Sequence, residues 1–455
     1  MRRLLFMVCC VLLAGLSPRA AHSQGSGQAG TVVYEGARLI PGDGSAAIED
    51  GAFVVQAGRI SAIGPRNKVK APAGAVHVEL TGKTVMPTLI NVHVHIGYQG
   101  YTSWGAENYT AQNVLDHLER EAFYGVGATQ SVGSSPTDAS IEFERDQKAG
   151  KFPPASRFFF MPGMAPPNGG PDAILIKGTS ALHAVYEISS PEQARAAVRS
   201  MAAKNLKSVK IWVDDRRGTY PKMPPEVYDA VIDEAHQHHM MVNAHATTLA
   251  DQKAVVRAGI DVLVHIVANE KVDEEYLALL RDKKPYWTPV MGLGDRSEVC
   301  DNDPFVTQVL PVQTVKAVRE KECQQDPATA AAREAMIENN FSKMIAAGAR
   351  LVLGTDAGIS PRYSFGWADH HEIARYVQLG LSPSEAITAA TARPAQLLGI
   401  DDMGALAVGK SADFIVLDAN PLDDIHNTRK IASVYLDGKR LDREALLAAW
   451  QKTAM

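Results

Sequence analysis

Two histidines, His93 and His95, stand two positions apart in an apolar stretch that runs over residues 88–96. Side chains of a β-strand alternate between its two faces, so both imidazoles would project on one side and Val92 and Val94 on the other. Two imidazoles that converge at a strand end make half of a zinc-type site. An isolated His-x-His is equally compatible with two half-buried structural histidines, so the rest of the chain decides between these interpretations.

Four further residues with metal-binding chemistry lie on or near the ends of predicted strands: Lys210, His245, His265 and Asp356. The steps of 35 residues from Lys210 to His245 and of 20 residues from His245 to His265 each leave room for one short strand–helix unit. A single histidine at a strand end is more often a bystander than a ligand. Six candidate ligands at the same depth of one fold instead favour a common metal site.

Eight predicted strands alternate with helices, a pattern typical of parallel βα units. The strands are predicted at residues 88–96, 128–132, 157–161, 208–213, 240–245, 262–266, 286–290 and 351–356. Ser190 followed by Pro191, and Ser382 followed by Pro383, are helix starts with an N-cap and a proline in the first turn. The pattern predicts an α/β fold of the (β/α)8 TIM-barrel type, whose chemistry lies at the carboxyl ends of its strands.

Short β-strands broken by tight turns occupy both ends of the chain. Residues 31–85 are rich in β-forming residues with turns at Gly42 and Gly58, and the same pattern of short strands and turns occurs again after Gly409. We expect residues 24–86 and 404–455 to pair into one small β-sandwich, with the barrel at 87–403 between them. Neither terminal block alone has enough residues for a full core.

Composition limits the classes of partner. The 455 residues are 46% hydrophobic and 21% charged, which is ordinary for a globular protein, and the net charge is −5. Nothing in this balance indicates nucleic-acid binding or an anionic membrane surface, so the expected partner is a small molecule. A homo-oligomer is left open.

The N-terminus predicts an export signal. Arg2 and Arg3 precede an apolar run over residues 4–16, and Ala21 and Ser23 supply the small residues of a cleavage site after Ser23. The run is short for a membrane span, so we expect cleavage of residues 1–23 and a periplasmic or secreted protein without a membrane partner. An uncleaved anchor is the alternative.

Two cysteines, Cys300 and Cys323, remain after that cleavage. An even count in an oxidising compartment favours a disulfide, although two free thiols are the other interpretation. Both residues lie in a long segment, 292–328, that follows the seventh predicted strand. A second long segment, 165–190, follows the third, and we expect both to gate or select substrate.

These motifs together carry a resemblance. The His-x-His strand, Lys210, the two later histidines and the run Gly354–Gly358 resemble the amidohydrolase superfamily, and Thr391–Gly399 with Gly409–Phe414 is similar to its last helix and returning strand. Within it the chain looks most like the imidazolonepropionase-related branch with Xaa-Pro dipeptidases and ochratoxinase-type amidases. Asn91 departs from the aspartate common in the family, a position that is usually not a ligand.

The resemblance implies a role for each of the six residues. His93, His95 and Asp356 would bind a buried metal ion, His245 and His265 a more exposed one, and a carboxylated Lys210 would bridge both. The expected cofactor is Zn²⁺, two ions per subunit, with Co²⁺ or Mn²⁺ as substitutes and a single metal beside an ordinary lysine as the alternative. A hydroxide bridging the metals would attack the substrate while Asp356 moves the proton.

We therefore expect an exported metal-dependent amidohydrolase that cleaves an amide or peptide bond in a dipeptide such as Xaa-Pro or an N-acyl amino acid of the ochratoxin type. A hydrolase of cyclic amides, lactones or phosphotriesters on the same metals is the first alternative, and a non-catalytic metal- or ligand-binding barrel is the second. Weaker signals suggest substrate contacts from Trp212, Arg216, Tyr220 and His371, although solvated arginines are an equally good interpretation.

Overall fold

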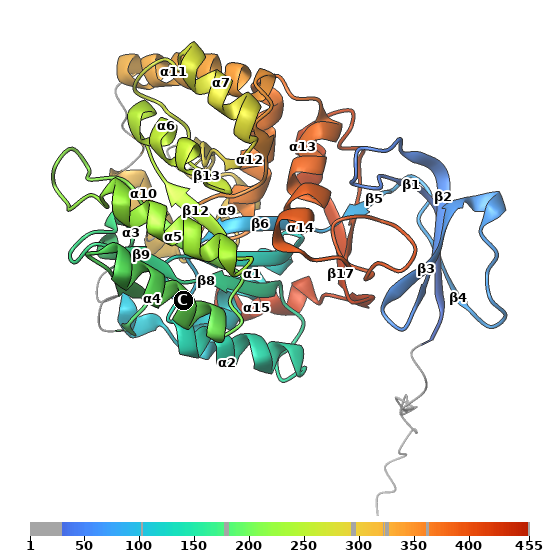
Figure 1. Ribbon diagram of the computed structural model, residues 1–455. Helices are drawn as coiled ribbons and strands as arrows, with labels where there is room; N and C mark the ends of the chain where they lie inside the picture. The colour runs from blue at the N-terminus through green and yellow to red at the C-terminus, as the bar shows by residue number, and fades with distance from the viewer. Residues whose placement is uncertain are drawn as a thin grey trace, which may run out of the picture.

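A computed structural model describes residues 30–101, 103–176, 182–292, 297–321, 323, 327–360 and 364–453. The predicted signal peptide over residues 1–23 and the lead-in that follows it lie outside the described residues. Figure 1 shows two parts: a helix-covered set of parallel strands, and a β-sheet to one side of it that is built from strands near both ends of the chain. No described helix has the length and apolarity needed to cross a membrane.

Strands from both terminal regions form one eight-stranded sheet. Its strands are β1 (Val32–Leu39), β2 (Ile48–Gln56), β3 (Arg59–Pro65), β4 (Val76–Glu79), β5 (Thr84–Pro87), β16 (Phe414–Leu417), β17 (Ile431–Leu436) and β18 (Lys439–Arg440). β5 pairs with β1 on one side and antiparallel to β16 on the other, which joins the two regions. Tyr34, Phe53 and Phe414 pack ring against ring in its core.

Parallel strands form the second part, and each of the eight predicted strands overlaps an observed one, the eighth by a single residue. They are β6 (Leu89–Val94), β7 (Val126–Val132), β8 (Arg157–Met161) with its continuation β9 (Gly163–Ala165), β11 (Ser208–Trp212), β12 (Met241–His245), β13 (Val262–Val264), β14 (Tyr286–Thr288) and β15 (Arg350–Leu351), with β10 (Val185–Glu187) at the edge beside β9. The fold is therefore α/β with parallel sheets.

Backbone hydrogen bonds also join the first of these strands to the segment after the last. Val92 N–H donates to the carbonyl of Leu353 at 2.9 Å, and His95 N–H donates to the carbonyl of Ala357 at 2.7 Å. At the break between β8 and β9, Lys210 N–H donates to the carbonyl of Pro162 at 2.9 Å. The segments that carry His95 and Asp356 are thereby tied to each other, and the strand that carries Lys210 is tied to the β8–β9 break.

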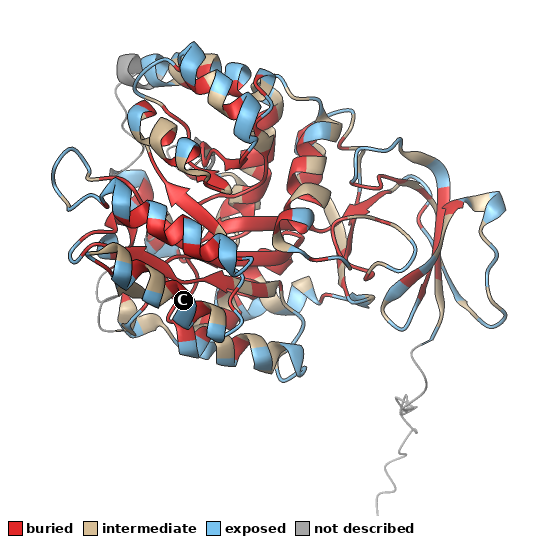
Figure 2. Ribbon diagram, in the orientation of Figure 1, coloured by how far each residue is buried: buried red, intermediate tan, exposed pale blue. Residues whose placement is uncertain are grey.

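Helices cover the outside of these strands, with their buried faces turned inward (Figure 2). They are α1 (Ala111–Phe123), α2 (Thr137–Lys148), α3 (Pro171–Leu175), α4 (Pro191–Ala203), α5 (Pro225–Gln237), α6 (Leu249–Ala258), α7 (Glu274–Lys283), α8 (Ser297–Cys300), α9 (Pro304–Thr307), α10 (Val312–Lys321), α11 (Pro327–Ala346), α12 (Trp367–Gln378), α13 (Pro383–Ala390), α14 (Ala392–Leu398) and α15 (Arg443–Thr453). The 3-10 helices are η1 (Arg66–Lys68), η2 (Ala106–Asn108) and η5 (Ile425–Arg429).

The two predicted helix starts are confirmed. The Ser190 side chain accepts a hydrogen bond from Gln193 N–H at the start of α4. Ser382 and Glu385 form a reciprocal capping box at the start of α13, which satisfies two backbone N–H groups that the helix leaves unpaired.

The two long segments contain short helices of their own. The segment after β9 carries α3 and β10, and the segment after β14 carries α8, α9 and α10. Cys300 and Cys323 form a disulfide with a Cα–Cα distance of 5.7 Å, so the free-thiol interpretation is excluded. The disulfide ties α8 to the residues that follow α10.

Candidate metal centre

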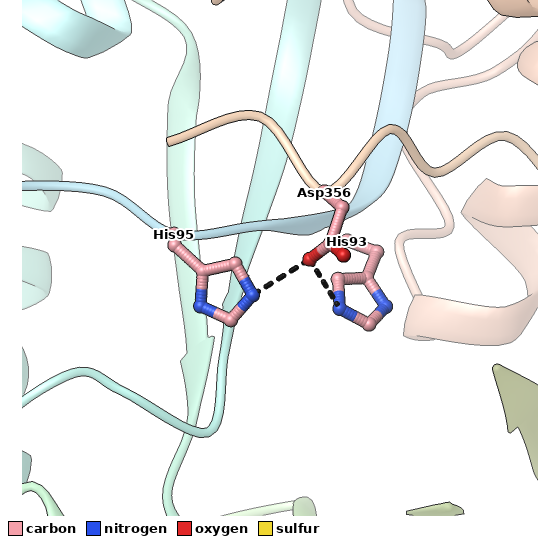
Figure 3. A group of neighbouring side chains, drawn as sticks. All are labelled: His93, His95 and Asp356. Atoms are coloured by element: carbon pink, nitrogen blue, oxygen red, sulfur yellow. Dashed lines mark hydrogen bonds and ion pairs between the residues drawn. The ribbon is translucent and has the colours of Figure 1, made fainter. Parts of the chain in front are cut away.

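The first group of candidate ligands is formed by His93, His95 and Asp356, shown in Figure 3. Asp356 Oδ1 lies 2.8 Å from His95 Nε2 and 3.3 Å from His93 Nε2. Both histidine side chains have no exposed surface and that of Asp356 is 3% exposed. His95 Nδ1 lies 2.8 Å from Ser134 Oγ, which fixes the ring orientation. This group presents two Nε2 atoms and a carboxylate to a common point.

The backbone places these three side chains. The amide N–H groups of Thr355 and Asp356 both donate to the carbonyl of His93, at 3.1 and 2.8 Å. Asp356 has a φ of +60°, in the left-handed region that costs a non-glycine residue of order 1–3 kcal/mol and clusters at functional sites. A Cβ on Gly354 would come within 2.7 Å of His93 Cβ, so only glycine permits this approach.

Asn91 supports the same strand. Its Oδ1 accepts from His93 N–H at 3.0 Å, and its Nδ2 donates to Thr355 Oγ1 at 2.9 Å. The amide thus links β6 to the segment that carries Asp356. Asn91, which stands where the family commonly has an aspartate, therefore still holds this strand in place.

The second group is formed by His245 at the end of β12, His265 just after β13, and Asp172 in α3. His245 Nδ1 lies 2.8 Å from His265 Nε2 and 2.9 Å from Asp172 Oδ2. His265 has a φ of +77°, again in the left-handed region. His265 is the partly exposed member of the two groups, whereas the others are buried. The rings of His93 and His265 are 6.1 Å apart, so the two groups are neighbours.

Lys210 lies in β11 with no exposed surface. Its Nζ makes no hydrogen bond within the described part of the chain, and neither ring nitrogen of His93 makes one there. The lysine stem is confined by Gly133, where an added Cβ would lie 2.8 Å from Lys210 Cγ. Burial lowers the pKa of Lys210 to about 8, although the carboxylates of Asp172 and Asp356 act to raise it. A buried amine that loses its proton this readily is suited to carboxylation.

The charges of the site follow from burial and from neighbouring groups. Burial lowers the pKa of His93 to about 4, so its imidazole is neutral, the form that binds a metal ion. Burial acts to raise the pKa of Asp356, but His93 and His95 outweigh it and hold that pKa well below its usual range. Burial acts to lower the pKa of His245, but Asp172 and Asp214 outweigh it and raise that pKa.

These donors fit divalent cations. They are imidazole nitrogens and carboxylate oxygens, the ligands that zinc prefers. The nitrogens of His93 and Lys210 are polar atoms without exposed surface that make no hydrogen bond within the described residues, and such atoms normally have hydrogen-bond partners. Outer residues also orient the ligands, Ser134 on His95 and Asp214 on His245, as is usual around bound metals.

Sequence reasoning missed Ser134, Asp172 and Asp214. Asp214 could have been found, because alternation along β11 and beyond it places residues 210, 212 and 214 on one side. Its Oδ2 lies 2.8 Å from His245 Nε2. Asp172 lies in a segment rich in glycine and proline, where no periodic pattern indicates which side chain points inward.

The four predicted substrate contacts are placed differently from one another. Trp212 is 1% exposed and donates its indole N–H to Asp172 Oδ2 at 2.8 Å. Arg216 pairs with two carboxylates, Asp172 at 2.9 Å and Asp214 at 3.3 Å, while 39% of its side chain stays exposed to solvent.

The other two, Tyr220 and His371, lie beside the two long segments. Tyr220 lines a cavity of about 390 Å³ formed by the segment after β9 together with residues that follow β11. His371, in α12, lies against Gly292 of the segment that follows β14, where an added Cβ would meet its Cδ2 at 2.7 Å. Their roles toward a substrate stay predictions.

Comparison with known proteins identifies the class. The model of the Amidohydrolase family matches residues 84–441. The chain therefore belongs to the Amidohydrolase family, and it is a hydrolase that acts on amide bonds of small molecules. Members of this family generally bind divalent metal ions, in agreement with the two donor groups.

Individual relatives match either most of the chain or a short part of it. The ochratoxinase of Aspergillus niger is 24% identical over 90% of this chain and 86% of its own length. The imidazolonepropionase of Deinococcus radiodurans is 37% identical, but over only 22% of this chain and 25% of its own length. A crystal structure of a candidate prolidase from Bifidobacterium longum has a TM-score of 0.70 and 26% identity, covering 94% of this chain and 100% of that chain.

A Xaa-Pro dipeptidase with methionine bound in its active site has a TM-score of 0.71 and 24% identity, covering 90% of this chain and 99% of that chain. At this level of identity the likeness shows the fold alone. The predicted membership of the amidohydrolase superfamily is confirmed by the family match.

Proposed function

We propose that this chain is an exported, binuclear zinc amidohydrolase that cleaves the amide bond of an N-acyl amino acid of the ochratoxin type or of a dipeptide such as Xaa-Pro. One observation carries the proposal: two donor groups, His93–His95–Asp356 and His245–His265, flank a buried lysine whose amine makes no hydrogen bond within the described residues. Such an arrangement has no evident structural purpose, because each unpaired buried polar group costs stability.

The residues divide into two ligand sets. His93, His95 and Asp356 would hold the more buried ion, and His245 and His265 the more exposed one, on the side where His265 meets solvent. Lys210 would bridge them after its neutral amine adds carbon dioxide, forming an N–C bond and releasing one proton. The resulting carbamate is an anion with two oxygens, whereas a lysine ammonium would be repelled by both cations.

When bound, divalent cations polarise a scissile carbonyl and lower the pKa of water toward ~7. The protein contributes the proton transfer. Asp356 is ionised, since its pKa is held well below the usual range, so it can accept the proton of the attacking water. It then donates that proton to the nitrogen of the leaving amine. Asp356 therefore acts first as general base and then as general acid.

The amide substrate class is supported by the relatives. The relative named ochratoxinase spans most of this chain, and similar folds include those named Xaa-Pro dipeptidase and candidate prolidase. Substrate choice depends on the segments after β9 and β14, whose short helices α3 and α8–α10 differ from the regular alternation elsewhere.

A substrate panel tests the proposal. Purified chain loaded with zinc or cobalt is offered N-acyl amino acids, Xaa-Pro dipeptides, a cyclic amide, a lactone and a phosphotriester. We expect hydrolysis of an N-acyl amino acid or a dipeptide, and loss of that activity in Asp356→Asn. Asp282→Asn is the matched control, because Asp282 is 71% exposed on α7 and should leave the rate unchanged. Turnover of only the ester substrates, or of none, would overturn the assignment.

We also infer that the parallel strands close into a (β/α)8 barrel over residues 87–403 and that residues 24–86 and 404–455 form a separate β-sandwich domain. The hydrogen bonds from Val92 and His95 to the segment after β15 support closure. Export is supported by the Cys300–Cys323 disulfide, since such bonds persist in oxidising compartments. N-terminal sequencing of protein from the periplasm or medium should begin at Gln24, and retention of Met1 would contradict cleavage.

A further inference from the structure

Asp172 differs from the other residues of the candidate metal centre, because it lies in a helix and not at or just after the end of a parallel strand. It lies in α3, in the segment that follows β9, and is 2% exposed. Gly170 precedes the helix with a φ of +75°, and a Cβ there would lie 3.1 Å from Ala165 and 3.3 Å from the Trp212 ring. The backbone of this short helix is therefore held tightly against the site.

The carboxylate of Asp172 faces the same nitrogen of His245 that faces His265. Its Oδ2 lies 2.9 Å from His245 Nδ1, and that Nδ1 lies 2.8 Å from His265 Nε2. Two ligand atoms about 2.1 Å from one ion and at right angles to each other are ~3.0 Å apart. The observed separations are thus those of donors that can share one cation.

Two groups keep Asp172 in this position. The indole N–H of Trp212 donates to Oδ2 at 2.8 Å, and Arg216 Nη2 donates to Oδ1 at 2.9 Å. Arg216 also holds Asp214, by its backbone N–H at 2.8 Å and by Nη1 at 3.3 Å.

The carboxylates of Asp172 and Asp214 contact different nitrogens of His245. Asp214 contacts Nε2, the nitrogen that points away from His265, so it supports the ring from behind. Asp172 contacts Nδ1, on the side of His265. The same geometry therefore separates an orienting carboxylate from one that can itself bind.

We propose that Asp172 is a direct ligand of the more exposed metal ion, through Oδ2, in addition to His245, His265 and the bridging lysine. This inference rests on the proposed function, because it requires an ion at that pair of histidines. A third carboxylate also removes one further positive charge from a buried site that holds two divalent cations. Arg216 then acts as a positioning residue for this ligand rather than as a contact for a substrate carboxylate.

Metal binding and cobalt spectroscopy test the inference. The full chain is stripped with a chelator and titrated with cobalt, and ions per chain, the affinity of each site and the visible and near-ultraviolet absorption are recorded. The variants are Asp172→Asn and Asp172→Cys. Asp215→Asn is the matched control, a neighbour of Asp214 whose nearest cation is Lys222 at 3.9 Å. Thermal unfolding of each metal-free variant reports whether it folds.

We expect wild type and Asp215→Asn to bind two cobalt ions with the same absorption. Asp172→Asn should keep the first ion and bind the second at least tenfold more weakly, the lower limit for loss of even an outer partner. Asp172→Cys offers a thiolate that is one bond shorter than the carboxylate, a difference that the longer metal–sulfur bond partly offsets, and it should add a thiolate-to-cobalt charge-transfer band. A merely structural role for Asp172 would not produce that band, so Asp172→Cys keeps the test decisive if Asp172→Asn folds poorly.

Two results would overturn the inference, and they are distinguishable. If wild type and Asp172→Asn both bind two ions with equal affinity and Asp172→Cys shows no new band, Asp172 is not a ligand while the binuclear centre stands. If wild type binds fewer than two ions, the proposed binuclear centre fails together with the inference.

Discussion

Replacement of Lys210 by methionine should stabilise the metal-free protein. The Lys210 ammonium is fully buried and makes no hydrogen bond within the described part of the chain, and burial lowers its pKa from 10.5 to about 8. Because a pKa shift of one unit corresponds to ~1.4 kcal/mol, burial disfavours the charged form of Lys210 by ~3 kcal/mol in the folded protein. A swap that conserves volume costs less than ~1.5 kcal/mol in packing, so Lys210→Met should gain ~2 kcal/mol at pH 7.

The sign of the pH dependence follows from linkage. Between pH 8 and 10.5 the unfolded chain holds the Lys210 proton and the folded chain does not, so the unfolding free energy of wild type rises with pH. Below pH 8 both states hold it and the full penalty is present. The advantage of Lys210→Met over wild type should therefore be constant below pH 8 and disappear by pH 10.5.

The assay is urea unfolding of chelator-treated protein in buffer free of carbon dioxide, which prevents carboxylation of the amine. Lys148→Met is the matched control, because Lys148 is 73% exposed on α2 and should change the unfolding free energy by less than ~0.5 kcal/mol. A Lys210→Met protein that is less stable than wild type at pH 7, or whose difference from wild type does not change between pH 8 and 10.5, would refute this reasoning.

Three further predictions concern other parts of the molecule. Asp356→Asn should lower kcat by ~10²–10⁴-fold, the usual contribution of a general acid–base group, and steady-state kinetics with equal metal loading would detect a rate that is unaffected. Cys300→Ser should lower the unfolding free energy by ~3 kcal/mol, since the disulfide with Cys323 closes a loop of 23 residues, and unchanged urea unfolding would count against this. The pKa of Glu121 is raised well above its usual value by burial and by Asp369, so the folded state holds a proton that the unfolded state releases above pH ~4.3. Stability should therefore fall as pH rises from there toward the raised pKa, and Glu121→Gln should reduce that fall; parallel unfolding curves at pH 5–9 would argue otherwise.

Much of the site could be predicted because strand geometry is strictly periodic. The alternation of side chains places His93 and His95 on one side of β6, and their rings are 5.6 Å apart. The strand that carries Lys210 and the one that ends at His245 are paired in parallel, which brings residues distant in sequence to the same depth. These positions followed from pattern alone, without knowledge of any loop.

The rest of the site could not be predicted, because it depends on chain segments whose side chains follow no periodic pattern. β9 and β10 have three residues each, too few for alternation to distinguish them from a turn. Asp172 enters the site after a turn at Pro167 and Asn168 and a left-handed Gly170, which together direct α3, and no local pattern specifies that direction. The eighth strand was predicted over 351–356 but is regular only at Arg350–Leu351, because the chain turns into the left-handed region at Asp356.

The number of zinc ions that the chain retains tests the central claim most directly. Protein reconstituted with zinc in bicarbonate buffer, desalted and analysed by inductively coupled plasma mass spectrometry should contain two ions per chain, and Lys210→Ala should contain at most one. One ion or none in wild type, or an unchanged zinc content in Lys210→Ala, would contradict a lysine-bridged pair of metal ions at these strand ends.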